Sequence, residues 1–178
     1  MKVNEHRLAE ARHSPSPHQD SRPSEEISLI VVHGISLPPG EFGGNEVEDL
    51  FLGQLDTTSP AFHDLHGVKV SSHLFIGRSG EIVQFVNFDQ RAWHAGESKF
   101  RGRSFCNDFS IGIELEGTDT IEYEDIQYKL LAQVCHALKG EYGIKEVHGH
   151  CHIAPGRKTD PGPSFEWQKL ELMLAQMT

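Results

Sequence analysis

A nearly continuous apolar run at residues 27–33, Ile-Ser-Leu-Ile-Val-Val-His, is the feature that most constrains the fold. Consecutive aliphatic and β-branched side chains predict a strand that is buried on both faces. Strands and helices are then predicted to alternate along the rest of the chain. The other predicted strands are residues 73–76, 81–86, 110–116 and 145–150, and the predicted helices are residues 47–55, residues 123–139 and a final helix from about residue 164.

This order of elements predicts one α/β domain with a mixed central β-sheet flanked by helices. The chain has 178 residues, which matches a single ordinary domain. Residues 1–26 are polar and contain two Ser-Pro steps. We therefore expect them to form an N-terminal arm without a strand ladder, either lying on the domain surface or frayed. The folded domain is expected to be residues 27–178.

Charge and hydropathy exclude several classes of protein. The 26 acidic and 16 basic side chains give a formal charge of −10, which argues against a general nucleic-acid binder. No uninterrupted apolar run is longer than residues 29–32, far shorter than a membrane helix requires. The first thirty residues have no apolar core of the secretory type, so we expect a cytoplasmic protein with free cysteine thiols. We also expect a monomer.

Histidine is the outlier in the composition, with 12 residues. His33 ends the buried strand, at the position where open α/β sheets bind ligands. Three more histidines lie within residues 147–152, and if this segment is extended their side chains share one face. Asp160 follows His150 by ten residues. Together, His33, His150 and Asp160 would form an open zinc site with two imidazoles, one carboxylate and no thiolate.

Two further side chains would turn such a metal site into a hydrolase. Glu114 lies on the polar face of the 110–116 strand, where it could accept a proton from an activated water. A solvated strand face explains Glu114 equally well. Lys158 lies two residues before Asp160 and could stabilise an oxyanion. The alternative for Lys158 is an ordinary surface lysine.

Five longer motifs follow one another in the sequence: VVHGISLPPGEFGG, HLFIGRSGEIVQFV, RAWHAGESKFRGR, CNDFSIGIELEG and GHCHIAPGRKTDPGPSF. Together they resemble the AmpD family of zinc-dependent 1,6-anhydro-N-acetylmuramoyl-L-alanine amidases. The resemblance extends from about residue 8 to residue 167, nearly the whole chain. The wider family includes phage lysozyme-amidases and animal peptidoglycan recognition proteins, and it implies a mixed sheet flanked by helices.

The resemblance also implies a role for individual residues. It implies zinc ligands at His33, His150 and Asp160, a general base at Glu114 and an oxyanion-stabilising lysine at Lys158. The implied substrate is an anhydro-muropeptide. The implied reaction is hydrolysis of the amide bond between the lactyl group of 1,6-anhydro-N-acetylmuramic acid and L-alanine, in cytoplasmic peptidoglycan recycling.

Three positions depart from the family pattern. Gly34 replaces an asparagine that commonly follows the first ligand, Lys69 replaces an arginine, and Phe105 stands where an arginine is often found. A protein of charge −10 needs a local basic cluster to bind an anionic peptide. The hypothesised substrate-binding residues are Lys69 and Arg103 for the peptide carboxylates, and Trp93 and His94 for the sugar side.

Three other functions are compatible with parts of the sequence. A non-catalytic peptidoglycan-binding module predicts a replaced ligand or base, whereas all are present here. An amidase that acts on intact cell wall outside the cytoplasm predicts an export signal. A structural zinc protein would use Cys151 with His148 or His152 in a closed tetrahedral site.

Overall fold

A six-stranded mixed sheet forms the centre of the computed structural model, which describes residues 1–177. The strand order is β12 (Glu146–Gly149), β5 (Leu29–Ile35), β11 (Ser110–Glu116), β6 (Leu74–Ile76), β7 (Ile82–Gln84) and β3 (Arg12–His13). The first four strands are parallel to one another, and β7 and β3 run in the opposite direction. Together with the helices, this sheet confirms the predicted α/β domain with a mixed central sheet.

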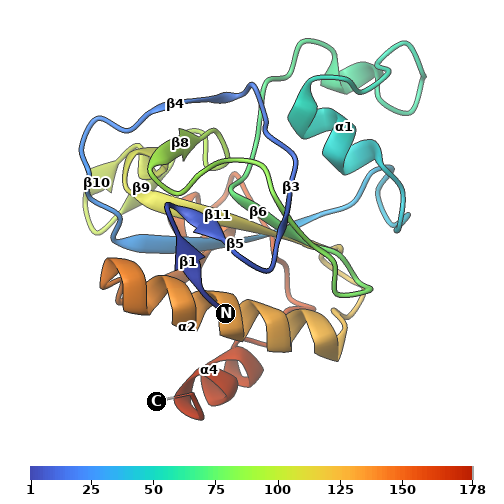
Figure 1. The fold of residues 1–178 in the computed structure, drawn as a ribbon. Helices are drawn as coiled ribbons and strands as arrows, with labels where there is room; N and C mark the ends of the chain where they lie inside the picture. The colour runs from blue at the N-terminus through green and yellow to red at the C-terminus, as the bar shows by residue number, and fades with distance from the viewer. Residues whose placement is uncertain (178) are drawn as a thin grey trace.

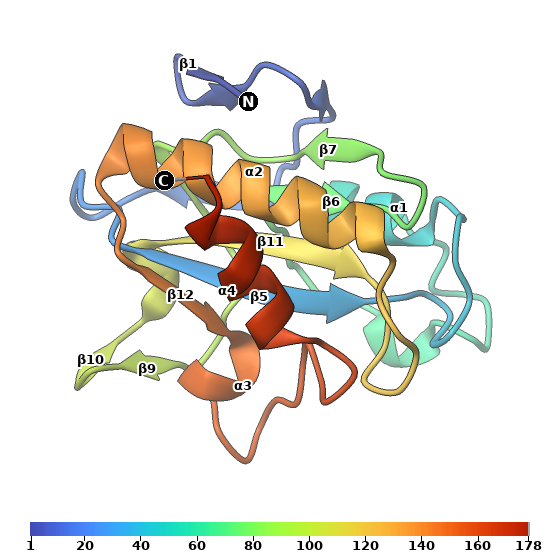
Figure 2. The same ribbon diagram turned by 90° about the horizontal axis from the view of Figure 1, so that it is seen from below.

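Helices cover both faces of the sheet (Figure 1). On one face, α2 (Asp125–Tyr142) and α4 (Trp167–Ala175) pack together against the apolar side chains of β5 and β11. Figure 2 shows these two helices crossing the sheet. The short helix α1 (Glu46–Leu52) packs through Val47 and Phe51 against β7 and the residues that follow it. No helix within residues 1–177 is long and apolar enough to cross a membrane.

The two central strands, β5 and β11, pair in parallel over seven residues. Because side chains alternate along a strand, Ile30 and Val32 join the core beneath α2, whereas Val31 and His33 point to the other face. Every residue of β11 is buried. His33 is paired with Glu114 in the register, so an imidazole and a carboxylate lie side by side on the face opposite α2.

The predicted strands and helices are present, with shifted ends. The predicted hairpin is confirmed as β6 and β7. Helix α1 ends three residues before the predicted boundary because Gly53 adopts a left-handed conformation (φ 69°) that closes its last turn. Helix α2 continues past the predicted end until Gly143 stops it in the same way (φ 67°). After residue 26, the elements that the sequence did not indicate are β8 (Gln90–Ala92), β9 (Lys99–Phe100), β10 (Arg103–Ser104), the 3-10 turns His63–Leu65 and Cys106–Asp108, and the helical turn α3 (His150–Ile153).

The extended conformation considered for residues 147–152 is wrong beyond Gly149. Strand β12 ends there and α3 begins with the next residue. The His152 ring turns back, and its Nδ1 accepts the backbone N–H of Gly149 at 3.0 Å, which caps the first turn of the helix. The ring then packs against Trp167. The three histidines of this segment therefore do not share one face.

Residues 1–26 are built into the domain more closely than predicted. The expectation of an arm without a ladder is wrong, because β1 (Val3–Asn4) pairs with β2 (Arg7–Leu8), β3 joins the edge of the central sheet and β4 (Gln19–Ser21) pairs with β8. Pairing satisfies backbone groups that the edges of β7 and β8 would otherwise leave open. The division of the chain at residue 26 itself stays a prediction.

Arg12 ties this N-terminal segment to α1 and to the hairpin. Its guanidinium donates to both carboxylate oxygens of Glu48, at 2.9 and 2.7 Å, and to Glu81 at 2.9 Å. The hydrogen bonds from Arg12 hold the pKa of Glu48 below its usual value.

We predict that Glu48→Gln lowers the melting temperature by about 1–4 °C near pH 7, because a partly exposed ion pair contributes about 0.5–1 kcal/mol. The folded-state pKa of Glu48 lies below the unfolded value, so this contribution is present above the unfolded pKa and is lost as the pH falls through the folded pKa. The difference between parent and variant should therefore shrink below about pH 4.5, as followed by thermal unfolding. Glu171→Gln on the exposed side of α4 is the control, and a difference independent of pH would contradict the assignment.

Candidate metal centre

Parallel strands bring three potential metal ligands to one edge of the sheet. His33 lies near the carboxyl end of β5, and His150 directly follows the parallel strand β12. Asp160 comes from the loop after α3, and its backbone carbonyl accepts the N–H of Cys151 at 2.9 Å, which holds that loop against the helical turn. Because the carboxyl ends of parallel strands meet at one edge, side chains far apart in the sequence converge there.

The donor atoms of these residues are close enough to share one metal ion. Asp160 Oδ2 lies 3.1 Å from Nδ1 of both His33 and His150, and the two Nδ1 atoms are 3.0 Å apart. In tetrahedral coordination with bonds of about 2.0–2.1 Å, ligand atoms are about 3.3 Å apart. Within residues 1–177, His33, His150 and Asp160 form a group whose ligand atoms all lie within 4.8 Å of one another. The geometry of this triad fits a divalent metal.

The protonation states of the triad also suit a metal. Burial lowers the pKa of His33 to about 4, and the neutral ring is the form that coordinates. Burial opposes the ionisation of Asp160, but its close contacts with His150 and His33 hold the pKa of its carboxyl well below the usual value. The site therefore presents neutral imidazole beside an ionised carboxylate.

Glu114 lies beside the triad, and Lys158 lies in the loop that carries Asp160. Glu114 Oε1 is 3.9 Å from His33 Nδ1, and the residue is only 7% exposed, so the solvated strand face considered for Glu114 is wrong. Burial and the charge of Asp160 raise the pKa of Glu114 well above its usual value, while Lys158 lowers it. Lys158 itself is exposed, and its charge also acts on His33. Four of the five residues singled out for chemistry therefore converge at one edge of the sheet, and the fifth, Lys158, belongs to the loop that carries Asp160.

Cysteine does not take part in this centre. Cys106, Cys135 and Cys151 are free thiols, as predicted. Within residues 1–177, Cys151 belongs to no group of three potential ligand atoms. The described structure therefore gives no support to the closed zinc site with His148 or His152.

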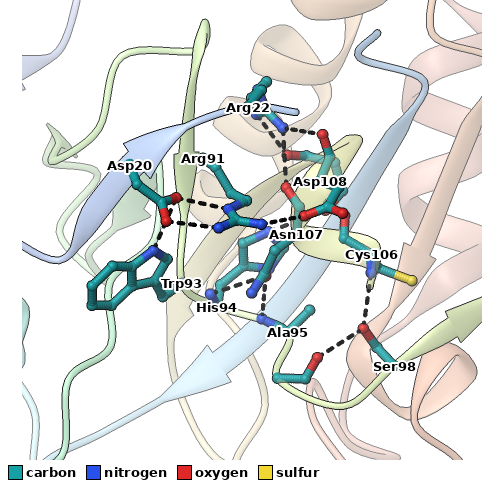
Figure 3. A network of polar contacts seen from close by, with 12 residues as sticks. Asp20, Arg22, Arg91, Trp93, His94, Ala95, Ser98, Cys106, Asn107 and Asp108 are labelled. Carbon is teal, nitrogen blue, oxygen red and sulfur yellow. Dashed lines mark hydrogen bonds and ion pairs between the residues drawn. The ribbon is translucent and has the colours of Figure 1, made fainter. Parts of the chain in front are cut away.

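Trp93 and His94 follow β8 and contact different partners. His94 Nδ1 lies 2.9 Å from Nε2 of His33, so this residue touches a candidate ligand. The Trp93 indole N–H donates to Asp20 at 3.2 Å, and Arg91 clamps the same carboxylate at 2.7 and 2.6 Å (Figure 3). Trp93 is thus held against the N-terminal segment, and a role for it in sugar binding stays a prediction.

Arg103 lies away from the triad, and Lys69 is exposed. Lys69 lies in the exposed segment before β6. Arg103 pairs with Glu26 at 2.8 Å and lies over the Phe109 ring, 4.0 Å from its centre. Glu26 precedes the first residue of β5, and Phe109 precedes the first residue of β11. His33 is the fifth residue of β5, about 13 Å further along the strand than its first residue. Their joint role in binding peptide carboxylates stays a prediction.

Sequence reasoning did not single out Tyr123, which links two ligand-bearing segments. Its hydroxyl donates to the carbonyl of Pro161 at 2.9 Å, directly after Asp160. The same hydroxyl oxygen lies 2.2 Å from where a Cβ of Gly34 would be, directly after His33. Tyr123 therefore fills the space that a side chain at position 34 would need, which explains the glycine. The departure from the family pattern at Gly34 was the one feature of the sequence that could have drawn attention to Tyr123.

Comparison with known proteins identifies the family. A family model described as N-acetylmuramoyl-L-alanine amidase matches residues 23–163. The chain belongs to this amidase family. A relative from Citrobacter freundii, the 1,6-anhydro-N-acetylmuramyl-L-alanine amidase AmpD, is 56% identical over 98% of this chain and 95% of its own. The AmpD of Haemophilus influenzae is 47% identical over 91% of each chain. The resemblance to the AmpD family is confirmed.

Solved structures of amidases share the fold. The crystal structure of a selenomethionine derivative of AmpD matches with a TM-score of 0.95 at 56% identity, covering 98% of this chain and 99% of that chain. The amidase AmiD from Escherichia coli matches with a TM-score of 0.60 at 29% identity, covering 94% of this chain and 60% of that chain. The AmiD structure is a complex with the substrate anhydro-N-acetylmuramic acid-L-Ala-D-gamma-Glu-L-Lys.

We predict that Tyr123→Phe weakens binding of Zn²⁺ about five-fold, because the loss of one hydrogen bond of about 1 kcal/mol loosens Pro161 and with it Asp160. Gly34→Ala should have a similar effect, since the added methyl group displaces the Tyr123 hydroxyl. Competition with a chromophoric chelator measures both dissociation constants. The double variant should bind Zn²⁺ no more weakly than the poorer single variant, because both changes break the same bond. Parental affinity in both single variants would contradict this role.

Proposed function

We propose that this chain is a zinc-dependent amidase that hydrolyses the bond between the lactyl group of 1,6-anhydro-N-acetylmuramic acid and L-alanine. The observation that carries the proposal is the convergence of His33, His150 and Asp160 with Glu114 beside them. Two imidazoles and a carboxylate without a thiolate are typical of hydrolytic zinc sites. AmpD relatives that are 56% and 54% identical to this chain support the choice of bond.

The chain's own residues supply the proton transfers and the charge stabilisation. Zinc, when bound, supplies Lewis acidity, which polarises an amide carbonyl and acidifies water near neutral pH. Glu114 accepts the proton of the attacking water and returns it to the departing alanine nitrogen. Its raised pKa makes it a stronger base than an ordinary glutamate. The ammonium group of Lys158 stabilises negative charge on the carbonyl oxygen.

A groove lies on the far side of His150 from the other two ligands. It has a volume of about 530 Å³ and lies between the β9–β10 hairpin and α3, with Phe105 and Arg157 in its lining. Arg157 donates to the carbonyl of Ala95 at 2.7 Å, and the same carbonyl faces Nε2 of His150. The groove therefore lies behind the His150 ring, on the side away from Asp160, and none of the three triad residues is in its lining. Phe105 is 69% exposed at the edge of this groove.

Four other residues complete the proposed binding site. Lys69 and Arg103 are the proposed contacts for the peptide carboxylates, and Trp93 and His94 for the sugar. Arg103 has to leave Glu26 to take part. The proposed setting is cytoplasmic peptidoglycan recycling by a monomer, without a nucleic-acid or membrane partner. The charge of −10 supports the absence of a nucleic-acid partner.

The decisive experiment is cleavage of anhydro-muramoyl tripeptide followed by mass spectrometry. We expect free tripeptide and the anhydro-sugar, loss of cleavage after treatment with a chelator, and recovery when zinc is restored. Intact peptidoglycan is incubated in parallel. Cleavage of intact peptidoglycan but not of the anhydro-muropeptide would favour an amidase of intact cell wall, and no cleavage of either by the zinc-loaded protein would favour a binding module.

Substitutions should separate the proposed base from the proposed ligands. We predict that Glu114→Gln keeps one bound zinc but lowers kcat at least about a hundred-fold, because the amide side chain cannot accept the proton. Asp160→Ala should lose both zinc and turnover, because two histidines alone hold the ion weakly. Metal analysis by mass spectrometry and turnover of the tripeptide substrate measure the two effects. Full activity of Glu114→Gln would remove Glu114 from the mechanism.

A further inference from the structure

Two consecutive residues contact both histidine ligands on the side that faces away from the metal centre. Nδ1 of His94 lies 2.9 Å from Nε2 of His33. The backbone carbonyl of Ala95 lies 3.1 Å from Nε2 of His150. Histidines that bind a metal usually donate their second N–H to a partner of this kind, which fixes the tautomer and the orientation of the ring. Residues 94–95 thus occupy the right position to orient both imidazoles.

Ser110 determines where the protons of this chain of contacts lie. Its hydroxyl oxygen is 2.6 Å from the carbonyl of Cys106 and 3.1 Å from Nε2 of His94. A carbonyl only accepts, so the hydroxyl proton is directed to Cys106 and the hydroxyl oxygen accepts the Nε2–H of His94. The neutral His94 ring then carries its lone pair on Nδ1, where it accepts the Nε2–H of His33. The free nitrogen of His33 is therefore Nδ1, the atom that faces Asp160.

The strand beneath His94 is shaped to hold the ring. Gly112 lies in the middle of β11, where glycine weakens a strand. A Cβ at this position would lie 2.5 Å from Cγ and 2.7 Å from Nδ1 of His94. The imidazole thus occupies the space that a side chain at position 112 would need, and it packs between Ser110 and the metal centre.

One further side chain holds the backbone that carries these contacts. Oδ1 of Asn107 accepts the backbone N–H of His94 at 3.2 Å and that of Ala95 at 2.8 Å (Figure 3). The partners of both histidine ligands are therefore fixed by the same amide oxygen.

We propose that His94 and Ser110 are positioning residues of the metal centre, which hold His33 in the tautomer and orientation that present Nδ1 to zinc. The inference rests on the zinc site of the proposed function. It concerns how tightly the ligands are prepared for the ion and assigns no contact with the reacting atoms to either residue.

Ser110→Ala is the first test. Without the hydroxyl, Nε2 of His94 loses its acceptor, and we expect the dissociation constant for Zn²⁺ to rise about ten-fold. Ser72→Ala is the matched control, because Ser72 is equally buried and its hydroxyl has no hydrogen-bond partner among the described residues. Its zinc affinity should equal that of the parent. Competition with a chromophoric chelator measures all three proteins.

Nitrogen NMR of ¹⁵N-histidine-labelled protein reads the tautomers directly. In the parent, with and without zinc, the His94 ring should show one form that carries its proton on Nε2. In Ser110→Ala we expect both tautomers in exchange, and in the Co²⁺-loaded variant a changed visible absorption spectrum, because His33 is less well oriented. A purely structural contribution of Ser110 to folding would lower the melting temperature without changing either spectrum.

A second pair of variants keeps the inference testable if Ser110→Ala does not fold. His94→Leu removes the acceptor for His33 and should weaken zinc binding about 10- to 100-fold. His94→Asn places an amide oxygen near the position of Nδ1 and should recover part of that loss. If the parent binds zinc and either Ser110→Ala or His94→Leu binds it as tightly as the parent, this inference is overturned while the proposed function stands. A parent that binds no zinc would contradict the proposed function and this inference together.

Discussion

The in-register parallel pairing of β5 with β11 is the interaction on which the rest of the structure depends. It places His33 opposite Glu114 because each is the fifth residue of its strand. The register is fixed on the other face, where Ile30 and Ile113 are fully buried in the core that α2 covers. A slip by one residue would turn every side chain of a strand to the opposite face. Apolar packing beneath α2 therefore sets the distance between the proposed base and the first ligand.

Local sequence patterns were sufficient for this central part of the molecule. The apolar run that ends at His33 and the alternation around Glu114 are both typical of strands, in which successive side chains point to opposite faces. The structure contains both strands. The identity of the ligands required more than periodicity. His150 and Asp160 are brought to His33 by the parallel pairing of β12 and by the loop after α3, and the resemblance to the AmpD family supplied what spacing alone left open.

The remaining features depend on contacts between distant segments, which leave little local signal. The helical turn after Gly149 depends on the His152 ring returning to cap it. The strands of residues 1–26 are only two or three residues long, too short for a visible period. Strands β1 and β2 form by pairing with each other, and β3 and β4 form by pairing with β7 and β8. Hydropathy likewise could not distinguish a buried Glu114 from a solvated one, because burial depends on what covers that face of the sheet.

Arg22 gives the N-terminal segment a further consequence. Its guanidinium donates to the backbone carbonyls of Asn107, Asp108 and Ser110, at 3.1, 3.2 and 2.8 Å. These residues belong to the same short stretch whose side chains hold His94. Attachment of the first strands to the domain and order at the metal centre are therefore linked equilibria. If the docked segment strengthens binding of the proposed zinc ion by a given free energy, binding of that ion must stabilise the docked segment against detachment and proteolysis by the same amount.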